Sequence, residues 1–122
     1  MPDIRQNTIN YLEMPVKNIA ATKDFFSNLF GWKFTDYGPD YTCFLGAGID
    51  GGFYTSEDCG FSSAGGPLIV FYYFDIDDIK AKVISLSGTV VKDIFDFPGG
   101  RRFHFTDLNN NEFAVWTDKP AE

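Results

Sequence analysis

The chain has 122 residues, 44% of them hydrophobic and 22% charged, which is typical of one globular domain and excludes a disordered chain. Its formal net charge of −7 disfavours nucleic acid as a partner, because such binding depends on cationic contacts with phosphate. No apolar run is long enough to span a membrane and residues 1–14 lack a signal-peptide pattern, so we expect a cytoplasmic protein without a membrane partner.

The first half of the chain predicts a strand, a helix and then three strands. Residues 8–16 form the first predicted strand, and Asn18 is a favourable cap for the helix that follows. Gly31 suits the left-handed position that ends a helix. The three later strands are expected over 32–37, 41–46 and 50–56.

The second half repeats this order after a Gly- and Ser-rich linker over 57–66. A predicted strand over 67–74 precedes a helix that Asp75 would cap and Gly88 would end. Residues 95–100 (FDFPGG) are expected as a loop. The remaining strands are predicted over 88–94, 101–107 and 112–118.

The two halves match each other at nearly constant spacing, which favours an internal duplication. Lys23 is repeated 57 positions later as Lys80, and the later strands align at a spacing of 61, which pairs Cys43 with His104. A chance similarity of two ordinary strand–helix units is the alternative. The sequence thus predicts an α+β fold in a single domain over 1–122, with βαβββ modules at 7–56 and 67–118.

Two segments carry a resemblance to a known family. Residues 16–32 (VKNIAATKDFFSNLFGW) and 99–116 (GGRRFHFTDLNNNEFAVW) resemble the helix motif and the C-terminal motif of the vicinal oxygen chelate superfamily. That superfamily includes glyoxalase I, extradiol dioxygenases, fosfomycin-resistance enzymes and bleomycin-resistance proteins. Leu108 and Asn110 depart from its Pro and Gly. The resemblance implies a curved mixed-sheet cup built by the two modules, a divalent metal in the cup of the enzymes, and a homodimer.

The resemblance also implies four metal-ligand positions, on the first and last strands of each module. In this chain they fall on Tyr11, Phe53, Leu68 and Ala114. Three of these side chains cannot bind a metal, and Tyr11 could do so only as a phenolate. A catalytic metal needs about three protein ligands. We therefore expect neither a metal nor another cofactor, with a relocated metal site as the alternative.

Strand alternation predicts which side chains face the cup. His104, the only histidine, is the candidate catalytic base, with Glu13 or Glu112 as its carboxylate companion. The alternatives are a structural histidine with one hydrogen bond and a solvated Glu112 at the start of a strand. The expected ligand contacts come from Tyr11, Glu13, Tyr72, Arg102, His104, Glu112 and Trp116.

These features predict a metal-free protein of the bleomycin-resistance type that binds a small aromatic or cationic molecule in its cup. The aromatic content of 18% exceeds what we expect a core to need, and the surplus suits a pocket. One alternative is a lyase, isomerase or dioxygenase-type enzyme of the same superfamily, with relocated metal ligands or with acid/base chemistry by His104 and Glu13. Another is a module whose cup is filled by its own Phe and Trp side chains.

Overall fold

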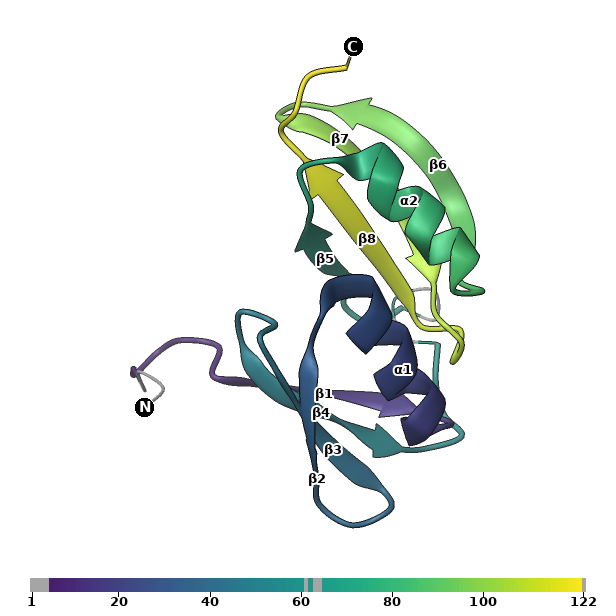
Figure 1. Ribbon diagram of the computed structural model, residues 1–122. Helices are drawn as coiled ribbons and strands as arrows, with labels where there is room; N and C mark the ends of the chain where they lie inside the picture. The colour runs from purple at the N-terminus through teal and green to yellow at the C-terminus, as the bar shows by residue number, and fades with distance from the viewer. Residues whose placement is uncertain (1–4, 61, 63–64, 122) are drawn as a thin grey trace. The chain divides into compact units, whose positions relative to one another are not determined.

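The computed structural model describes residues 5–60, 62 and 65–121, and the chain divides into two compact units between Asp58 and Cys59 (Figure 1). Residues 61, 63 and 64 of the predicted linker lie outside the described residues. None of the helices that the structure describes is long and apolar enough to cross a membrane.

Each unit has the order strand, helix and three strands, which confirms the predicted α+β fold of two βαβββ modules. Each sheet has its first and last strands parallel and in contact, and the orders are β1-β4-β3-β2 and β5-β8-β7-β6. The first unit contains β1 (Tyr11–Val16), α1 (Ile19–Phe30), β2 (Lys33–Asp36), β3 (Tyr41–Leu45) and β4 (Asp50–Thr55). The second contains β5 (Ile69–Tyr72), α2 (Ile76–Ser85), β6 (Thr89–Phe97), β7 (Gly100–Thr106) and β8 (Glu112–Thr117).

Both helices begin at the predicted caps, but only one ends as predicted. The side chain of Asn18 accepts a hydrogen bond at 2.9 Å from the first turn of α1, and Asp75 accepts one at 3.3 Å in α2. Gly31 ends α1 with a left-handed φ of 76°. At the end of α2 the left-handed residue is Ser87, with φ of 73°, and the expectation for Gly88 was wrong. Gly88 lies one residue further on, where its N–H closes the helix on Val83 O at 2.9 Å.

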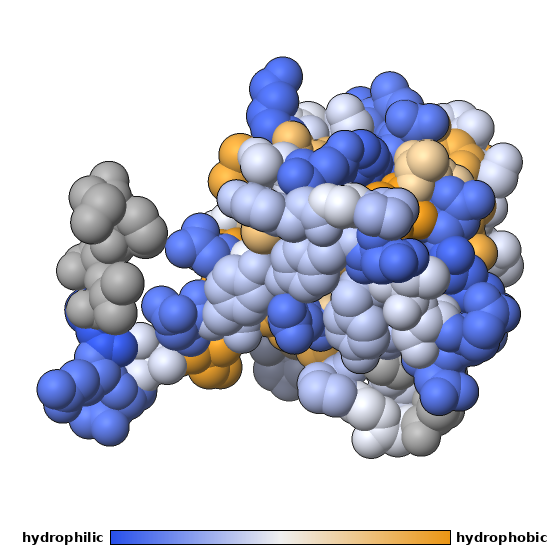
Figure 2. Space-filling model, turned by 90° about the horizontal axis from the view of Figure 1, so that it is seen from below, coloured by the Kyte–Doolittle hydropathy of each residue, from blue (hydrophilic) through white to orange (hydrophobic). Residues whose placement is uncertain are grey.

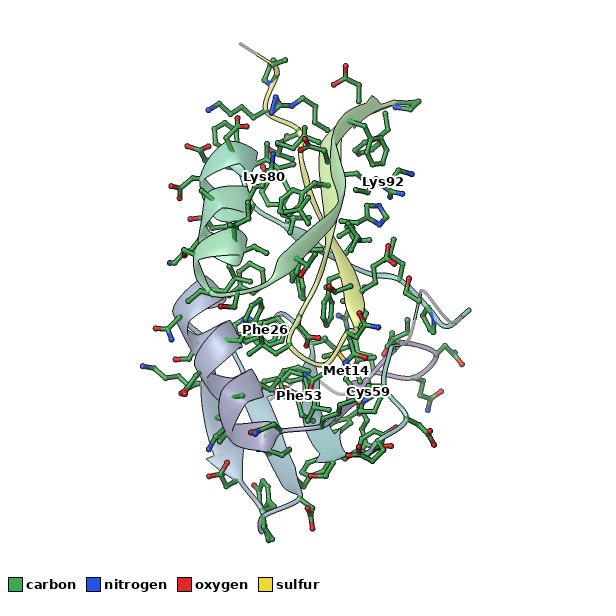
Figure 3. The ribbon with its side chains drawn as sticks, turned by 90° about the vertical axis from the view of Figure 1, so that its right-hand side faces the viewer. Met14, Phe26, Phe53, Cys59, Lys80 and Lys92 are labelled. Atoms are coloured by element: carbon green, nitrogen blue, oxygen red, sulfur yellow. The ribbon has the colours of Figure 1, made fainter. Side chains whose placement is uncertain are left out.

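One face of each sheet packs on its helix through phenylalanine. In the first unit Phe26 stacks on Trp32 at 5.0 Å and on Phe53 at 5.6 Å (Figure 3). In the second unit Phe103 and Phe105 are fully buried. The aromatic residues therefore build much of both cores. On the face shown in Figure 2, hydrophilic residues predominate and hydrophobic ones form separate patches between them.

The prediction that Phe53 occupies a ligand position of the cup was wrong. Phe53 pairs with Met14 across the sheet and is fully buried against the helix side. Gly52 instead pairs with Glu13 and lies on the opposite face. A spacing of 61 residues relates Cys43 to His104 correctly. In β4 the structural equivalent of Ala114 is Gly52, which is 62 residues earlier. An error of one residue reverses the face of a strand on which a side chain lies.

The expected loop over 95–100 was also wrong. β6 continues to Phe97, which pairs directly with Gly100, so only Pro98 and Gly99 turn the chain. The register of β6 on β7 shifts twice, on either side of the pair formed by Lys92 and His104. Such bulges bend a strand and redirect its side chains.

Candidate functional site

The open face of the second sheet, away from α2, gathers five of the seven predicted ligand contacts. Tyr72, Trp116 and Arg102 are neighbours in register on β5, β8 and β7. His104 lies two residues beyond Arg102, in the next row, beside Ala114. Glu112 is two residues before Ala114, and so shares its face. Figure 3 shows Lys92 of β6 on this same side of the sheet.

An aromatic hollow of about 220 Å³ lies on this face, lined by Val70, Phe97, Arg102 and Trp116. Trp116 meets Phe97 edge to face at 6.2 Å and Tyr72 at 5.1 Å, measured between ring centres. The hydroxyl of Tyr72 donates to Asp118 at 2.6 Å, and this bond raises the pKa of the phenol. The hollow is therefore bordered by rings whose positions are fixed by their neighbours.

Arg102 is a cation held by aromatic rings, and no carboxylate of the described part of the chain forms an ion pair with it. Its guanidinium carbon lies 5.3 Å from the ring centre of Phe95 and 5.8 Å from that of Phe97. Its Nε is buried and has no hydrogen-bond partner among the described residues. A buried donor without a partner costs about 1–3 kcal/mol. Rings offset part of this cost through their negative faces, but they leave the N–H groups able to donate.

His104 and Glu112 form a tight pair on the same face. His104 Nδ1 lies 2.8 Å from Glu112 Oε2, and the two side chains are 8% and 21% exposed. An ionised carboxylate can only accept, so the proton of a neutral imidazole lies on Nδ1 and Nε2 keeps its lone pair. Nε2 is buried and has no partner among the described residues. Of the two carboxylates considered from the sequence, Glu112 is the one bonded to this histidine.

The turn before β8 places Glu112. Asp107 accepts hydrogen bonds at 3.0 Å from the backbone N–H groups of Asn109 and Asn111. Asn110 adopts the left-handed conformation, with φ of 66°, so it replaces the glycine that the resemblance implies. Burial raises the pKa of Asp107, and the bonds from Asn109 and the backbone oppose that rise. The turn brings Glu112 opposite Thr106 in register.

The open face of the first sheet holds the other two predicted contacts, Tyr11 and Glu13. The hydroxyl of Tyr41 donates to Glu13 at 2.9 Å and is 2.6 Å from the hydroxyl of Tyr11, which also lies 3.3 Å from Cys43 Sγ. Burial, followed by the bonds to Tyr11 and Glu13, raises the pKa of Tyr41 well above its usual range. The bond to Cys43 is the main cause that raises the pKa of Tyr11. Both phenols are therefore held in their neutral form.

Tyr41 covers the centre of this face because Gly52 has no side chain. A Cβ built on Gly52 would lie 2.6 Å from the hydroxyl oxygen of Tyr41 and 2.6 Å from the carbonyl oxygen of Thr42. Gly52 pairs with Glu13 and Cys43, as Ala114 pairs with Val70 and His104 in the second unit. The two equivalent central positions thus carry the two smallest residues.

Comparison with protein families identifies the chain. Residues 8–115 match the model of the Glyoxalase/Bleomycin resistance protein/Dioxygenase superfamily. The chain belongs to this superfamily. Its membership agrees with the paired βαβββ modules and with the motifs around α1 and β8.

Relatives of this superfamily member include two curated proteins and several solved structures. It is 31% identical to the anthracycline biosynthesis protein DauV of Streptomyces sp. (strain C5) and 32% identical to DnrV of Streptomyces peucetius. In each case the match covers 87% of this chain but 45% of the relative, so the chain spans about half the length of these proteins.

The similar structures are more distant in sequence and show the fold. The fosfomycin resistance protein FosX of Listeria monocytogenes has a TM-score of 0.78 at 19% identity, covering 93% of this chain and 92% of that one. A family enzyme from Burkholderia phytofirmans PsJN has a TM-score of 0.75 at 17% identity, covering 88% and 96%.

The metal positions that the superfamily resemblance implies do not fit a divalent metal. After the correction at β4 they fall on Tyr11, Gly52, Leu68 and Ala114, of which Tyr11 alone offers a ligand atom. That atom is engaged with Tyr41 and Cys43. Among the described residues there is no group of three or more His, Cys, Asp or Glu side chains that could hold a metal ion.

The side chains of these faces that are absent from the predicted set of ligand contacts include Tyr41, Phe95 and Phe97. The signal for the two phenylalanines is their alternation with Asp96 immediately before a Pro-Gly turn, which is typical of a strand that continues to the turn. No comparable signal marks Tyr41, because its role depends on the missing side chain of Gly52 on the neighbouring strand.

Proposed function

We propose that this protein binds a small aromatic organic molecule on the open face of its second sheet, without a metal. The observation that carries the proposal is Arg102, a guanidinium without a carboxylate partner among the described residues, held over two phenylalanine rings at a hollow that also contains Trp116. A mostly apolar hollow with a few directed polar groups is the usual form of a small-molecule site.

The charge of this hollow favours a neutral or anionic ligand over the cationic one considered from the sequence. Arg102 is positively charged at all ordinary pH values and can only donate hydrogen bonds. A cationic ligand would meet like charge there, whereas a carboxylate or carbonyl oxygen would supply the partner that the guanidinium lacks. The flat faces of Trp116 and Phe97 suit an aromatic ring.

The named relatives agree with a small-molecule role. Two curated relatives are named for anthracycline biosynthesis, and a similar structure is named for fosfomycin resistance. The match covers 45% of the curated relatives and the structural similarity is at 19% identity, so these names support the broad class of ligand alone. The homodimer and the cytoplasmic location remain predictions.

Calorimetry with charged naphthalene probes tests the proposal. We expect 2-naphthoate to bind more tightly than naphthalen-2-ylmethylammonium, and Trp116→Leu to weaken naphthoate binding at least about tenfold because it removes the flat ring. Arg102→Gln should abolish the preference between the two probes. Tyr37→Leu is the matched control, since Tyr37 is 64% exposed in the first unit.

Two outcomes would contradict the proposal. One is that neither probe binds the wild-type protein. The other is that Trp116→Leu binds naphthoate as tightly as the wild type does while keeping its melting temperature.

A second candidate is an enzyme of the same superfamily that uses acid/base chemistry. The pair of His104 and Glu112 supports it, because an imidazole fixed by a carboxylate is a common general base. Glu13, the other predicted catalytic residue, is bonded to Tyr41 in the first unit. Turnover of a bound ligand that is lost in His104→Gln, with ligand binding retained, would favour this candidate.

A further inference from the structure

We infer that His104, held by Glu112, selects ligands that carry a hydroxyl group, which it binds through Nε2. The proposed ligand is then a hydroxylated aromatic molecule whose ring occupies the hollow beside Trp116. This inference rests on the proposed function and names the class of molecule that the same face would select.

The first step is the tautomer of the imidazole. Nδ1 is 2.8 Å from Glu112 Oε2, so Nδ1 is the donor and Nε2 is an acceptor in neutral His104. A carboxylate that holds one ring nitrogen in this way also fixes the orientation of the ring. Glu112 is therefore a positioning residue, and the acceptor that it creates points away from it.

The second step is that this acceptor is unused. Nε2 is buried without a partner among the described residues, in a side chain that is 8% exposed. Buried polar groups in proteins almost always have a hydrogen-bond partner. The charged groups around the ring are Glu112 on β8, Arg102 on β7 and Lys92 on β6, and neither cation has a lone pair or forms a hydrogen bond with Nε2. A donor supplied by a ligand would complete the site.

Arg102 and His104 lie close enough together for one small molecule to contact both. They are two residues apart on one face of β7, which separates their Cα atoms by about 7 Å. That span matches the length of a two-ring aromatic molecule. Beside the histidine the neighbouring position on β8 is Ala114, whose side chain is a single methyl group and is fully buried in the free protein. One end of such a molecule can thus lie at the guanidinium and the other at the imidazole.

Access of a ligand to His104 is limited by side chains of β6. Phe95 lies 6.0 Å from the His104 ring, and Lys92 lies 4.7 Å from the Phe95 ring, so these two side chains border the imidazole. The two register shifts of β6 flank Lys92, directly opposite His104. β6 is also an edge strand, so we expect a ligand to reach Nε2 by displacing Phe95, which leaves the central pairing of β7 with β8 intact.

The experiment compares 2-naphthol with 2-methoxynaphthalene, which has the same rings and oxygen but no hydroxyl hydrogen. Because the chain has one histidine, nitrogen-15 NMR of histidine-labelled protein without a histidine tag gives a single pair of ring signals. We expect the free protein to show the proton on Nδ1. We expect 2-naphthol to move the Nε2 signal and to bind at least about tenfold more tightly than 2-methoxynaphthalene, as one buried hydrogen bond would give.

Two variants separate this role from a structural one. His104→Leu should bind both probes equally, whereas Glu112→Gln should weaken 2-naphthol binding selectively and reduce the fraction of Nδ1-protonated imidazole. If His104→Leu does not fold, Glu112→Gln still tests the inference. Equal binding of the two probes by the wild-type protein, or an Nε2 signal that 2-naphthol does not move, would overturn the inference and leave the proposed function standing. Failure of both probes to bind would overturn the inference, and it would overturn the proposed function as well only if 2-naphthoate also fails to bind.

Discussion

Ser87 is a residue in a conformation that suits glycine better. Its φ of 73° lies in the left-handed region, where a side chain costs about 1–2 kcal/mol, and Gly31 holds the corresponding position at the end of α1. The two helices thus end with different residues at the same kind of cap.

We therefore predict that Ser87→Gly raises the free energy of unfolding by about 1 kcal/mol. The reverse change at the other helix, Gly31→Ser, should lower it by a similar amount, since no neighbouring atom restricts the added side chain within 4 Å. Urea unfolding followed by circular dichroism measures both. A loss of stability in Ser87→Gly would show that the serine hydroxyl contributes more than the strain costs.

At the scale of elements, both units fasten the helix to a strand with the same ion pair. Lys23 Nζ lies 2.9 Å from Asp36, and Lys80 Nζ lies 2.7 Å from Asp93. Each lysine lies in the middle of its helix, and each aspartate lies 13 residues later in the strand that follows the helix. Both aspartates are exposed, so each pair contributes little to the free energy of unfolding. The two pairs nevertheless make that free energy depend on pH in the acid range.

The lysines lower the pKa of both aspartates below the ordinary value of 3.8. The unfolded chain therefore takes up protons first as the pH falls. The stabilisation from these pairs is fully present above pH 3.8 and is lost as the pH falls below it through the folded-state pKa of each group.

We predict that the double variant Lys23→Met with Lys80→Met loses less stability than the wild type between pH 4.5 and about 2.5. Urea unfolding at each pH measures this difference, and carboxyl NMR should show the pKa of Asp36 and Asp93 rising toward 3.8 in the variant. Identical pH profiles for the two proteins would rule out the ion pairs as the cause.

The elements also show where sequence reasoning succeeded. The caps Asn18 and Asp75 and the alternation around Arg102 and His104 depend on neighbours in the chain, and the structure agrees with them. The face of Phe53 and the extent of β6 depend on register with another strand. The spacing between the repeats left that register uncertain by one residue, which is enough to reverse a face.

At the scale of the whole molecule, the repeated pattern of the two halves was the strongest signal in the sequence. It predicted the βαβββ order in both units because each copy supports the interpretation of the other. The contacts of the candidate site were harder to predict from the sequence. The bond between His104 and Glu112 was one of two pairings considered, and the cluster of Tyr11 with Tyr41 needed the register of β3 on β4.

We predict that metal removal leaves the whole molecule unchanged. Dialysis against a chelator should not shift the melting temperature, because a structural metal would contribute directly to folding and no described group of side chains fits one. Elemental analysis of the purified protein should find transition metals well below one per chain. A stoichiometric metal whose loss lowers the melting temperature would contradict the proposed metal-free function.

The glycine pair of β4 also limits how this protein could evolve. A Cβ on Gly51 would run into the backbone carbonyl of Leu12, and one on Gly52 would meet the backbone of Thr42 and the Tyr41 hydroxyl. A mutation that placed a carboxylate at Gly52 would therefore need a shift in the pairing of β3 with β4 and a replacement of Tyr41 as well. A carboxylate at this position thus depends on changes in two neighbouring strands rather than at one residue.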